Sequence, residues 1–328
     1  MIYNIIGDIH GQADKLEGLL LKLKYEMEDG IYRHNDRKAV FVGDFIDRGR
    51  QNRRVIEIVR SMVEYGHAYA VMGNHEYNAI CYHTPKSETD WLRSHTRSNF
   101  RQHENFLKEY PQGQDDTNDV INWFKTLPLY LEFDHFRVIH GCWDQEMIDQ
   151  LNSWLDENGI TAKEKFFTES ANKQTQLFQI VERLLKGVEV ELPPGFSFTD
   201  KDGKERHHIR VEWWGEAGAS FRKLAFGYDD DATNSFPDDQ APDSSSIPFY
   251  SSNNKPVFFG HYWMTGEPQL QKEKICCVDY SAGTDGDLVC YSFYDSKGVY
   301  GLSVENFTHF REDKCKLKIN FSFSVDED

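Results

Sequence analysis

Five short motifs in this chain join glycines to side chains that can bind a metal or transfer a proton. They are Gly7-Asp8-Ile9-His10-Gly11, Gly43-Asp44-Phe45-Ile46-Asp47-Arg48-Gly49, Gly73-Asn74-His75-Glu76, His140-Gly141 and Gly260-His261. The motifs supply carboxylates, imidazoles and one amide carbonyl but no thiolate, and divalent first-row metals accept these ligands. The flanking glycines let the backbone turn sharply and come close to a metal. The pattern therefore predicts a metal site.

The first three motifs follow apolar runs that have the composition of buried strands. Residues 2–6 and 39–42 each lead into Gly-Asp, and residues 68–72 lead into Gly-Asn. Apolar stripes with helical spacing lie between these runs, at Leu16, Leu19, Leu20 and Leu23 and at Val55, Ile58, Val59 and Met62. Strands joined by crossover helices predict a largely parallel sheet, in which ligands gather at the carboxyl ends of the strands. We therefore expect the polar residues of these motifs to lie together.

The remainder of the chain has a less regular pattern. Residues 77–126 are polar and mostly helical in pattern, short strands are expected within 130–139, and a helical region is expected over about 145–186. Residues 227–246 contain six aspartates and neither lysine nor arginine, which predicts a mobile acidic loop. Near the C-terminus, alternating apolar residues over 317–325 predict a half-buried strand.

Composition excludes several classes of protein. The 328 residues carry 37 Lys and Arg against 54 Asp and Glu, a net charge of −17, so we expect neither a nucleic-acid polymer nor a membrane surface as partner. An anionic substrate must then find local positive charge. No run of 18 apolar residues and no signal peptide are visible. The six cysteines form no C-x-x-C pair, which favours reduced thiols and a cytoplasmic location.

The ordered motifs resemble those of the calcineurin-like metallophosphoesterases. Within that family they resemble the phosphoprotein-phosphatase branch, which includes bacterial serine/threonine protein phosphatases and diadenosine tetraphosphate hydrolases. The resemblance extends from residue 7 to residue 261. It implies an α/β fold, a four-layer α-β-β-α sandwich of two mixed sheets. We expect a single domain over residues 1–328, with an insertion at about 144–255 that forms a cap over the site.

The resemblance also implies roles for individual residues. Metal one would be held by Asp8, His10 and the bridging Asp44, and metal two by Asp44, Asn74, His140 and His261. His75 would be the general acid and Asp47 its orienting partner. Phosphate would be bound by Arg48 and Asn74, and by a second arginine between His140 and His261, for which Arg210 and Arg222 are the candidates.

The implied activity is hydrolysis of phosphomonoesters by direct attack of a metal-bridging hydroxide. The substrate would be a phosphoprotein or a small phosphorylated molecule, and the cofactors two divalent metal ions, with Mn²⁺ expected and Fe or Zn also compatible. Trp263 stands where many metallophosphoesterases have a second histidine, which favours the phosphatase branch. The alternative is a dinucleoside polyphosphate hydrolase. Residues 278–283 of this chain resemble the segment that follows the last histidine motif in those enzymes. The oligomeric state is not determined by the sequence.

Other readings of the same residues are less favoured. The chain has no G-x-x-x-x-G-K-[ST] and no G-x-G-x-x-G, and none of its cysteines is followed six residues later by arginine. These absences argue against a kinase, an NTPase and a dinucleotide oxidoreductase, and the phosphate-binding loop of cysteine-dependent phosphatases is missing. A binding module that kept only the fold would have lost a ligand or His75, and all are present. Core packing is favoured over base stacking for Trp213 and Trp214, and a surface position for His207 and His208.

Overall fold

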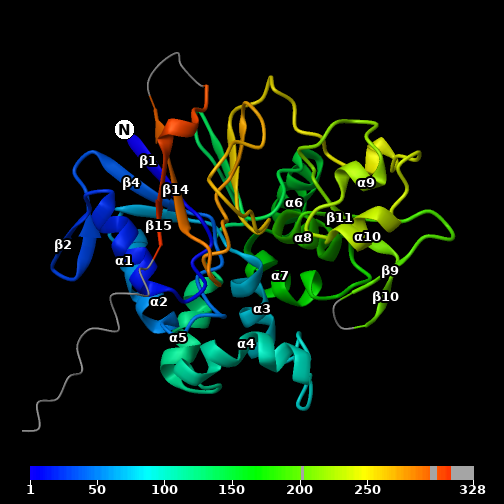
Figure 1. The fold of residues 1–328 in the computed structure, drawn as a ribbon. Coiled ribbons are helices and arrows are strands. Elements are labelled where there is room, and N and C mark those ends of the chain that lie inside the picture. Colours follow the sequence, from blue (N-terminus) through cyan, green and yellow to red (C-terminus); the bar gives the residue numbers. More distant parts are fainter. Residues whose placement is uncertain (201–202, 296–300, 312–328) are drawn as a thin grey trace, which may run out of the picture.

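A computed structural model describes residues 1–200, 203–295 and 301–311 of the chain (Figure 1). The strand predicted over 317–325 lies outside these residues. Among the helices that are described, none combines the length and the apolar character needed to cross a membrane.

The first sheet contains the three strands that the N-terminal motifs follow. Its order is β15-β14-β1-β4-β5. The strands are β1 (Ile2–Ile6), β4 (Arg37–Phe41), β5 (Ala68–Ala70), β14 (Leu288–Tyr294) and β15 (Phe307–Phe310). Strands β1, β4 and β5 are parallel, as predicted, whereas β14 and β15 pair in antiparallel fashion and make the sheet mixed.

The second sheet carries the last two motifs and has the order β13-β12-β7-β6. Its strands are β6 (Tyr130–Glu132), β7 (Arg137–Ile139), β12 (Val257–Phe259) and β13 (Ile275–Cys277). Strand β12 is parallel to both β7 and β13, and β6 is antiparallel to β7. This sheet is also mixed, as expected.

The two sheets pack face to face through a compact apolar core. Its buried residues are Ile5, Val40, Val42, Val71, Phe136, Val138, Phe258, Cys276, Val278, Tyr291 and Phe293. The ring of Phe136 lies 4.8 Å from that of Phe293 and 5.9 Å from that of Phe258, measured between centroids. Because both sheets bury one face here, their strand ends are held in fixed positions relative to each other.

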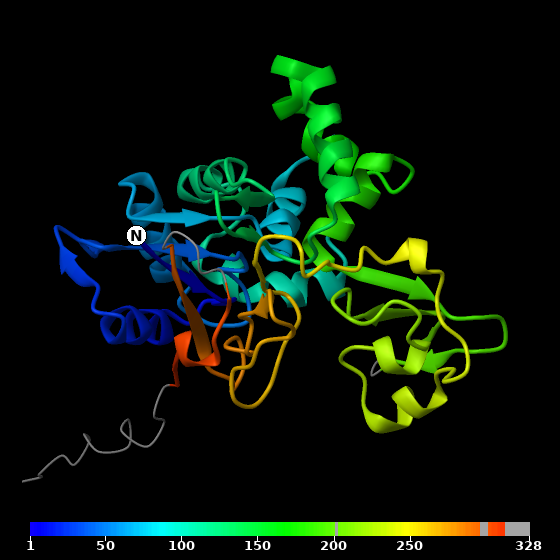
Figure 2. The same ribbon diagram turned by 90° about the horizontal axis from the view of Figure 1, so that it is seen from above.

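Helices cover the outer sides of the sandwich (Figures 1 and 2). Helices α1 (Ala13–Lys22) and α2 (Asn52–Glu64) contact the first sheet, and both predicted stripes are buried. Helices α6 (Gln145–Asn158), α7 (Ala162–Ser170) and α8 (Gln176–Lys186) pack on one another on the opposite side of the molecule from α1. The other large helices are α3 (Asn74–His83), α4 (Arg97–Glu109) and α5 (Asp115–Phe124).

One hairpin was not anticipated from the sequence. Strands β2 (Glu26–Glu28) and β3 (Ile31–Arg33) pair in antiparallel fashion between α1 and β4. Their turn residues, Asp29 and Gly30, both have positive φ, at 52° and 81°. An Asp-Gly pair between short strands is a hairpin signal, and this signal could have located the hairpin.

The chain between β7 and β12 adds a lobe beside the sandwich, on the right of Figure 2. After α8 it contains β8 (Val188–Glu191), β9 (Phe198–Thr199), β10 (Glu205–Arg206), β11 (His208–Val211), α9 (Phe221–Leu224) and α10 (Asp230–Ser235). Short 3-10 turns lie at Gly159–Thr161, Ser244–Ser246 and Val304–Asn306. Trp213 and Trp214 are buried, 4.8 and 5.1 Å from the Phe259 ring, and His207 and His208 are exposed.

The acidic segment 227–246 differs from the mobile loop that its composition predicts. Helix α10 lies within it, and the Phe236 side chain is only 1% exposed. Asp238 accepts a hydrogen bond from the Ser220 hydroxyl at 2.9 Å and forms an ion pair with Arg222. The segment is anchored because one buried aromatic ring and one carboxylate attach it to the lobe, which its aspartate content does not reveal.

Candidate metal centre

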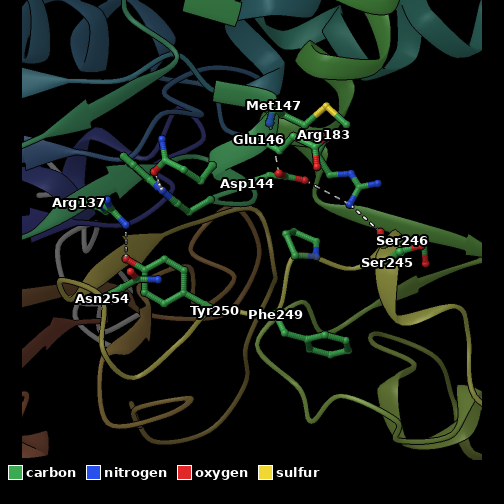
Figure 3. Close-up of a pocket in the computed structure, with 13 residues that line it drawn as sticks. Arg137, Asp144, Glu146, Met147, Arg183, Ser245, Ser246, Phe249, Tyr250 and Asn254 are labelled. Carbon is green, nitrogen blue, oxygen red and sulfur yellow. Dashed lines mark hydrogen bonds and ion pairs between the residues drawn. The ribbon is translucent and has the colours of Figure 1, made fainter. Parts of the chain in front are cut away.

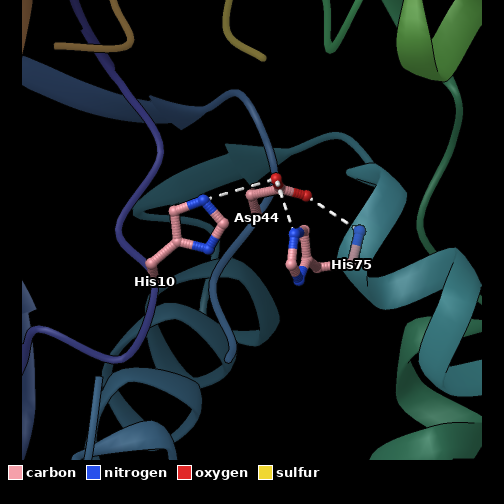
Figure 4. A group of neighbouring side chains, drawn as sticks. All are labelled: His10, Asp44 and His75. Carbon is pink, nitrogen blue, oxygen red and sulfur yellow. Dashed lines mark hydrogen bonds and ion pairs between the residues drawn. The ribbon is translucent and has the colours of Figure 1, made fainter. Parts of the chain in front are cut away.

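Asp44 lies at the centre of a cluster formed by the ends of five strands. Its Oδ2 atom is 3.6 Å from His10 Nε2, and its Oδ1 atom is 3.4 Å from His140 Nε2. His75 approaches the same carboxylate, with its Nε2 atom 3.9 Å from Oδ2 (Figure 4). Asp44 is only 2% exposed. Its position allows one carboxylate to serve two neighbouring ions.

Asn74 and Asp8 connect the remaining predicted ligands to this carboxylate. Asn74 Oδ1 lies 3.0 Å from His140 Nε2 and 2.7 Å from His261 Nδ1. Asp8 Oδ2 accepts a hydrogen bond from the His261 backbone N–H at 3.1 Å. The structure thus brings together all six residues predicted to bind metal, although they are spread over 253 positions of the sequence.

Two of the histidines are oriented by backbone carbonyls. His10 Nδ1 lies 3.0 Å from the Ile46 carbonyl oxygen, and His140 Nδ1 lies 2.8 Å from that of Val42. A carbonyl can only accept, so each Nδ1 donates, and in the neutral ring Nε2 is left as an electron-pair donor. Metal-binding histidines commonly have this arrangement.

Two polar atoms of the cluster test whether it fits a metal. Asp8 Oδ1 and His261 Nε2 are buried and find no hydrogen-bond partner among the described residues. Burial, and next the nearby Asp279 carboxylate, raise the pKa of Asp8 well above its usual range. A buried carboxylate oxygen without a partner is costly, and a cation would remove that cost. The donor set Asp, His and Asn suits divalent first-row metals, so the residues fit such ions.

The Glu76 side chain links the loop after β4 to the loop after β5. Its Oε2 atom accepts hydrogen bonds from the backbone N–H groups of Asp44 at 2.8 Å and Gly73 at 2.9 Å, and its Oε1 atom accepts one from Phe45 at 2.8 Å. The side chain is fully buried, and burial raises its pKa to about 7. The sequence motif contains Glu76 but assigns it no role, because two of its three partners are backbone groups 31 and 32 positions away.

The loops of the cluster have an unusual backbone. The non-glycine residues with positive φ include His10 (50°), Asp44 (52°), Asp47 (71°), Arg48 (55°) and His261 (64°). Such residues are strained and persist where the surrounding structure holds them, often at functional sites. The strain is consistent with side chains aimed at a common point.

His75 belongs to a buried network that leads away from the cluster. Its Nδ1 atom lies 2.5 Å from Asp47 Oδ2, while His103 Nδ1 lies 2.8 Å from Asp47 Oδ1. Burial opposes ionisation of Asp47, but His103 and then His75 hold its pKa at about 2. Burial also opposes protonation of His75, yet Asp44 and Asp47 raise its pKa. The sequence did not reveal His103, which lies 56 positions from Asp47 in no motif.

A polar cleft of about 810 Å³ opens beside the cluster. It is lined by Asn74, His75 and His261 and by five cationic side chains: Arg48, Arg93, Arg101, Lys186 and Arg210. Arg48, Arg93 and Arg101 form no ion pair with a carboxylate of the described chain, and Arg93 donates to Asn78 at 2.5 Å and Gln102 at 2.7 Å. Lys186 pairs with Glu182, and Arg210 Nη2 lies 4.0 Å from Glu189 Oε1. The cleft therefore supplies the local positive charge that an acidic chain needs for an anionic substrate.

The two candidate arginines of the insertion have different surroundings. Arg210 lines the cleft, and its Nε atom is buried and has no hydrogen-bond partner in the described part of the chain. Arg222 instead donates to the carbonyl oxygens of Phe236 at 3.1 Å and Asn234 at 3.0 Å. Arg222 does not line the cleft, and its guanidinium is used within the lobe. Of the two candidates, only Arg210 lies where it could meet a phosphate in the cleft.

Another cavity, of about 530 Å³, lies at the start of α6 (Figure 3). Arg137 donates to the Tyr250 hydroxyl at 3.2 Å, and Arg183 donates to the Ser246 carbonyl oxygen at 2.9 Å and pairs with Asp144. No predicted site residue lines this cavity. Both of its arginines are engaged, Arg183 by Asp144 and Arg137 by Glu132, so the cleft beside the cluster is the candidate active site.

Comparison with known proteins agrees with this geometry. Residues 3–221 match the calcineurin-like phosphoesterase family, so the chain belongs to that family of metal-dependent hydrolases of phosphoester bonds. The chain is 33% identical over 148 residues to the bis(5'-nucleosyl)-tetraphosphatase PrpE (asymmetrical) of Oceanobacillus iheyensis, covering 42% of this chain and 54% of that protein. It is 50% identical over 76 residues to the protein of that name from a Geobacillus strain, covering 23% and 31%. The chain thus spans about half or less of the length of these curated relatives.

Solved structures resemble the chain more distantly. A protein serine/threonine phosphatase from Saccharomyces cerevisiae has a TM-score of 0.49 at 16% identity, covering 96% of this chain and 81% of that one. A cold-active protein-tyrosine phosphatase from a Shewanella species has a TM-score of 0.49 at 16% identity, covering 88% and 75%.

Replacing Asp44 tests the cluster as a metal site. We predict that Asp44→Asn lowers the content of bound divalent metal to about half or less, because the neutral amide removes the charge shared between the two groups of ligands. Elemental analysis after dialysis provides the measurement. Asp29→Asn is the control, since the Asp29 side chain is 93% exposed and lies in the β2–β3 turn. Full metal content in Asp44→Asn would contradict the assignment.

The two arginines provide a matched pair for a second prediction. Arg210→Ala should raise KM for a phosphorylated substrate about tenfold while the bound metal is retained, because a guanidinium contacts the phosphate and not the ions. Arg222→Ala should change KM by less than about twofold and lower the melting temperature instead, through its lost backbone contacts. Steady-state kinetics measures KM for both variants, and thermal unfolding measures their melting temperatures. Equal effects of both substitutions on KM would remove Arg210 from the site.

Proposed function

We propose that this protein hydrolyses dinucleoside polyphosphates, and that the cationic cleft carries this assignment. A phosphomonoester presents one phosphate group, which one or two guanidinium groups can bind. Five cationic side chains line this cleft, and a chain of several phosphates has enough negative charge to engage them. The names of the PrpE relatives support the same substrate class. The alternative expected from the sequence thus moves ahead of phosphomonoester hydrolysis.

The proposed cofactors are two divalent metal ions. Asp8, His10 and Asp44 would hold one ion, and Asp44, Asn74, His140 and His261 would hold the other. Mn²⁺ is our proposal for both, and the same ligands suit Fe and Zn. When bound, such ions act as Lewis acids and bring the pKa of a coordinated water close to neutrality.

The chain's own residues bind the phosphates and move a proton. Arg48 and Arg210 are proposed to bind phosphoryl oxygens and to stabilise the negative charge that develops on them. Asp47 holds His75 through Nδ1, so that Nε2 carries the proton that the departing oxygen receives. Because Asp47 stays ionised, it supports the protonated form of His75. His103 positions Asp47 by occupying its other oxygen.

The insertion is proposed to complete this cleft as part of a single domain. Residues 144–255 contribute Lys186 and Arg210 to the lining, and every proposed metal ligand lies outside them. A lobe that supplies substrate-binding cations but no metal ligand can change specificity without disturbing the metals. This is the role expected of a cap.

A comparison of three substrates tests the proposed function. Purified protein with Mn²⁺ is given diadenosine tetraphosphate, a phosphopeptide and an aryl phosphate at equal concentrations. We expect kcat/KM to be at least about tenfold higher for the dinucleotide, because only it can engage the whole set of cations. Nucleotide products are separated by anion exchange. A preference for the phosphopeptide would restore the phosphomonoesterase interpretation.

Replacing His75 separates proton transfer from metal binding. His75→Asn should retain the metals and lose about 10² to 10⁴ in turnover on alkyl phosphates, whose leaving groups need a proton. The loss should be smaller for activated aryl esters. Turnover on both ester types, with elemental analysis and the exposed His207→Asn as control, provides the test. An equal loss on both esters would require another role for His75.

A further inference from the structure

Trp263 is the one large apolar side chain that lines the cleft within the described structure. Its side chain is 40% exposed, whereas Trp213 and Trp214 in the lobe are 0% and 4% exposed. The other lining residues are cationic, amide, hydroxyl or imidazole side chains. Phosphate binding alone does not explain why an indole is exposed among these polar groups, because an apolar ring surface does not bind phosphate.

The indole is held in position from both sides along the chain. Tyr262 is fully buried, and its hydroxyl accepts a hydrogen bond from the Val188 N–H at 3.1 Å and donates to the Val211 carbonyl oxygen at 3.3 Å. On the other side, the Met264 N–H donates to the Asp279 carbonyl oxygen at 2.9 Å. A flat ring that is fixed before a ligand arrives loses little entropy on binding.

Side-chain contacts further limit how the indole can move. It packs edge to face on Phe226, at 5.7 Å and 65°, and a Cβ atom on Gly227 would lie 2.7 Å from its Cζ2 atom. The aromatic surface that stays exposed belongs to a side chain lining the cleft. It is therefore a preformed apolar surface in an otherwise polar site.

A cation lies against this surface. The Arg210 guanidinium carbon lies over the Trp263 ring, 5.0 Å from its centre. Arg210 Nε has no hydrogen-bond partner in the described chain, and the charge of the guanidinium is met there only by the exposed Glu189, whose Oε1 atom is 4.0 Å from Nη2. Trp263 also follows the proposed metal ligand His261 by two positions, so both belong to the turn after β12. The Trp263 ring and the Arg210 guanidinium are therefore close enough for a single nucleotide to contact both, with its base on the ring and its phosphate on the guanidinium.

We propose that Trp263 and Arg210 form a nucleotide subsite, in which the indole stacks on a base and the guanidinium binds a phosphate attached to the same nucleoside. Stacking on an aromatic side chain tolerates different bases, because every base has a π face. This inference rests on the proposed function. It adds that Trp263 is the residue by which the site distinguishes a nucleotide from a polyphosphate without a base. The ligand class is a nucleoside 5'-phosphate unit.

Two probes that differ only by the base test the subsite. Binding of AMP and of ribose 5-phosphate to the Mn²⁺-loaded protein is measured by isothermal titration calorimetry. We expect AMP to bind about tenfold more tightly than ribose 5-phosphate. Trp263→Leu should reduce this ratio to less than about twofold, and Trp263→Phe should retain most of it. Tyr65→Leu, which removes a 68% exposed ring outside the cleft, should leave the ratio unchanged.

The outcomes distinguish the subsite from the proposed function. A wild-type ratio near one, or a ratio that Trp263→Leu leaves intact, overturns the subsite even if diadenosine tetraphosphate is hydrolysed. If the leucine variant does not fold, quenching of indole fluorescence by AMP in wild type, compared with Trp263→Phe, decides: equal quenching overturns the subsite. A base preference that depends on Trp263, without hydrolysis of the dinucleotide, supports the subsite and overturns the function.

Discussion

The buried carboxylate of Asp44 is the constraint on which the arrangement of the whole site depends. A charge removed from water must be balanced by nearby groups, and Asp44 is surrounded by His10, His75 and His140 within 4 Å. Burial opposes its ionisation, but His140 and then His75 hold the pKa of Asp44 well below its usual range. Each partner comes from a different segment: His10 and His140 from loops after strands, and His75 from the first turn of α3. These segments must therefore meet at one point, and the Glu76 side chain joins two of them by accepting hydrogen bonds from their backbone N–H groups.

The face-to-face sheets make such a meeting possible. In the first sheet β1, β4 and β5 are parallel, so their carboxyl ends lie at one edge, and in the second sheet β7 and β12 are parallel in the same way. Close approach at that edge leaves no room for some side chains. A Cβ atom on Gly43, whose φ is 101°, would lie 2.5 Å from the Gly73 nitrogen. The glycines of the motifs thus serve packing between loops as well as turning.

Charge is distributed so that an acidic protein can still bind an anion. The chain carries a net charge of −17, yet cationic side chains gather in the cleft beside the metal cluster. They come from the loop after β4, from the region around α4, and from the insertion. Low dielectric walls strengthen such a local field, and the surrounding negative charge does not cancel it at short range. The cations proposed to bind phosphate thus lie beside the residues proposed to bind metal, and Asn74 belongs to both sets.

Much of this protein could be predicted from the sequence, because strands and helices follow from local apolar periodicity and the proposed metal ligands occur in short motifs at strand ends. The parallel arrangement of β1, β4 and β5 and the proximity of Asp8, His10, Asp44, Asn74, His140 and His261 belong to this part. Only the tertiary structure distinguished Arg210 from Arg222 and revealed Glu76 and His103 as partners of the site. The reason is physical: a side chain's role depends on which groups surround it, and these groups come from segments that local periodicity does not place relative to one another.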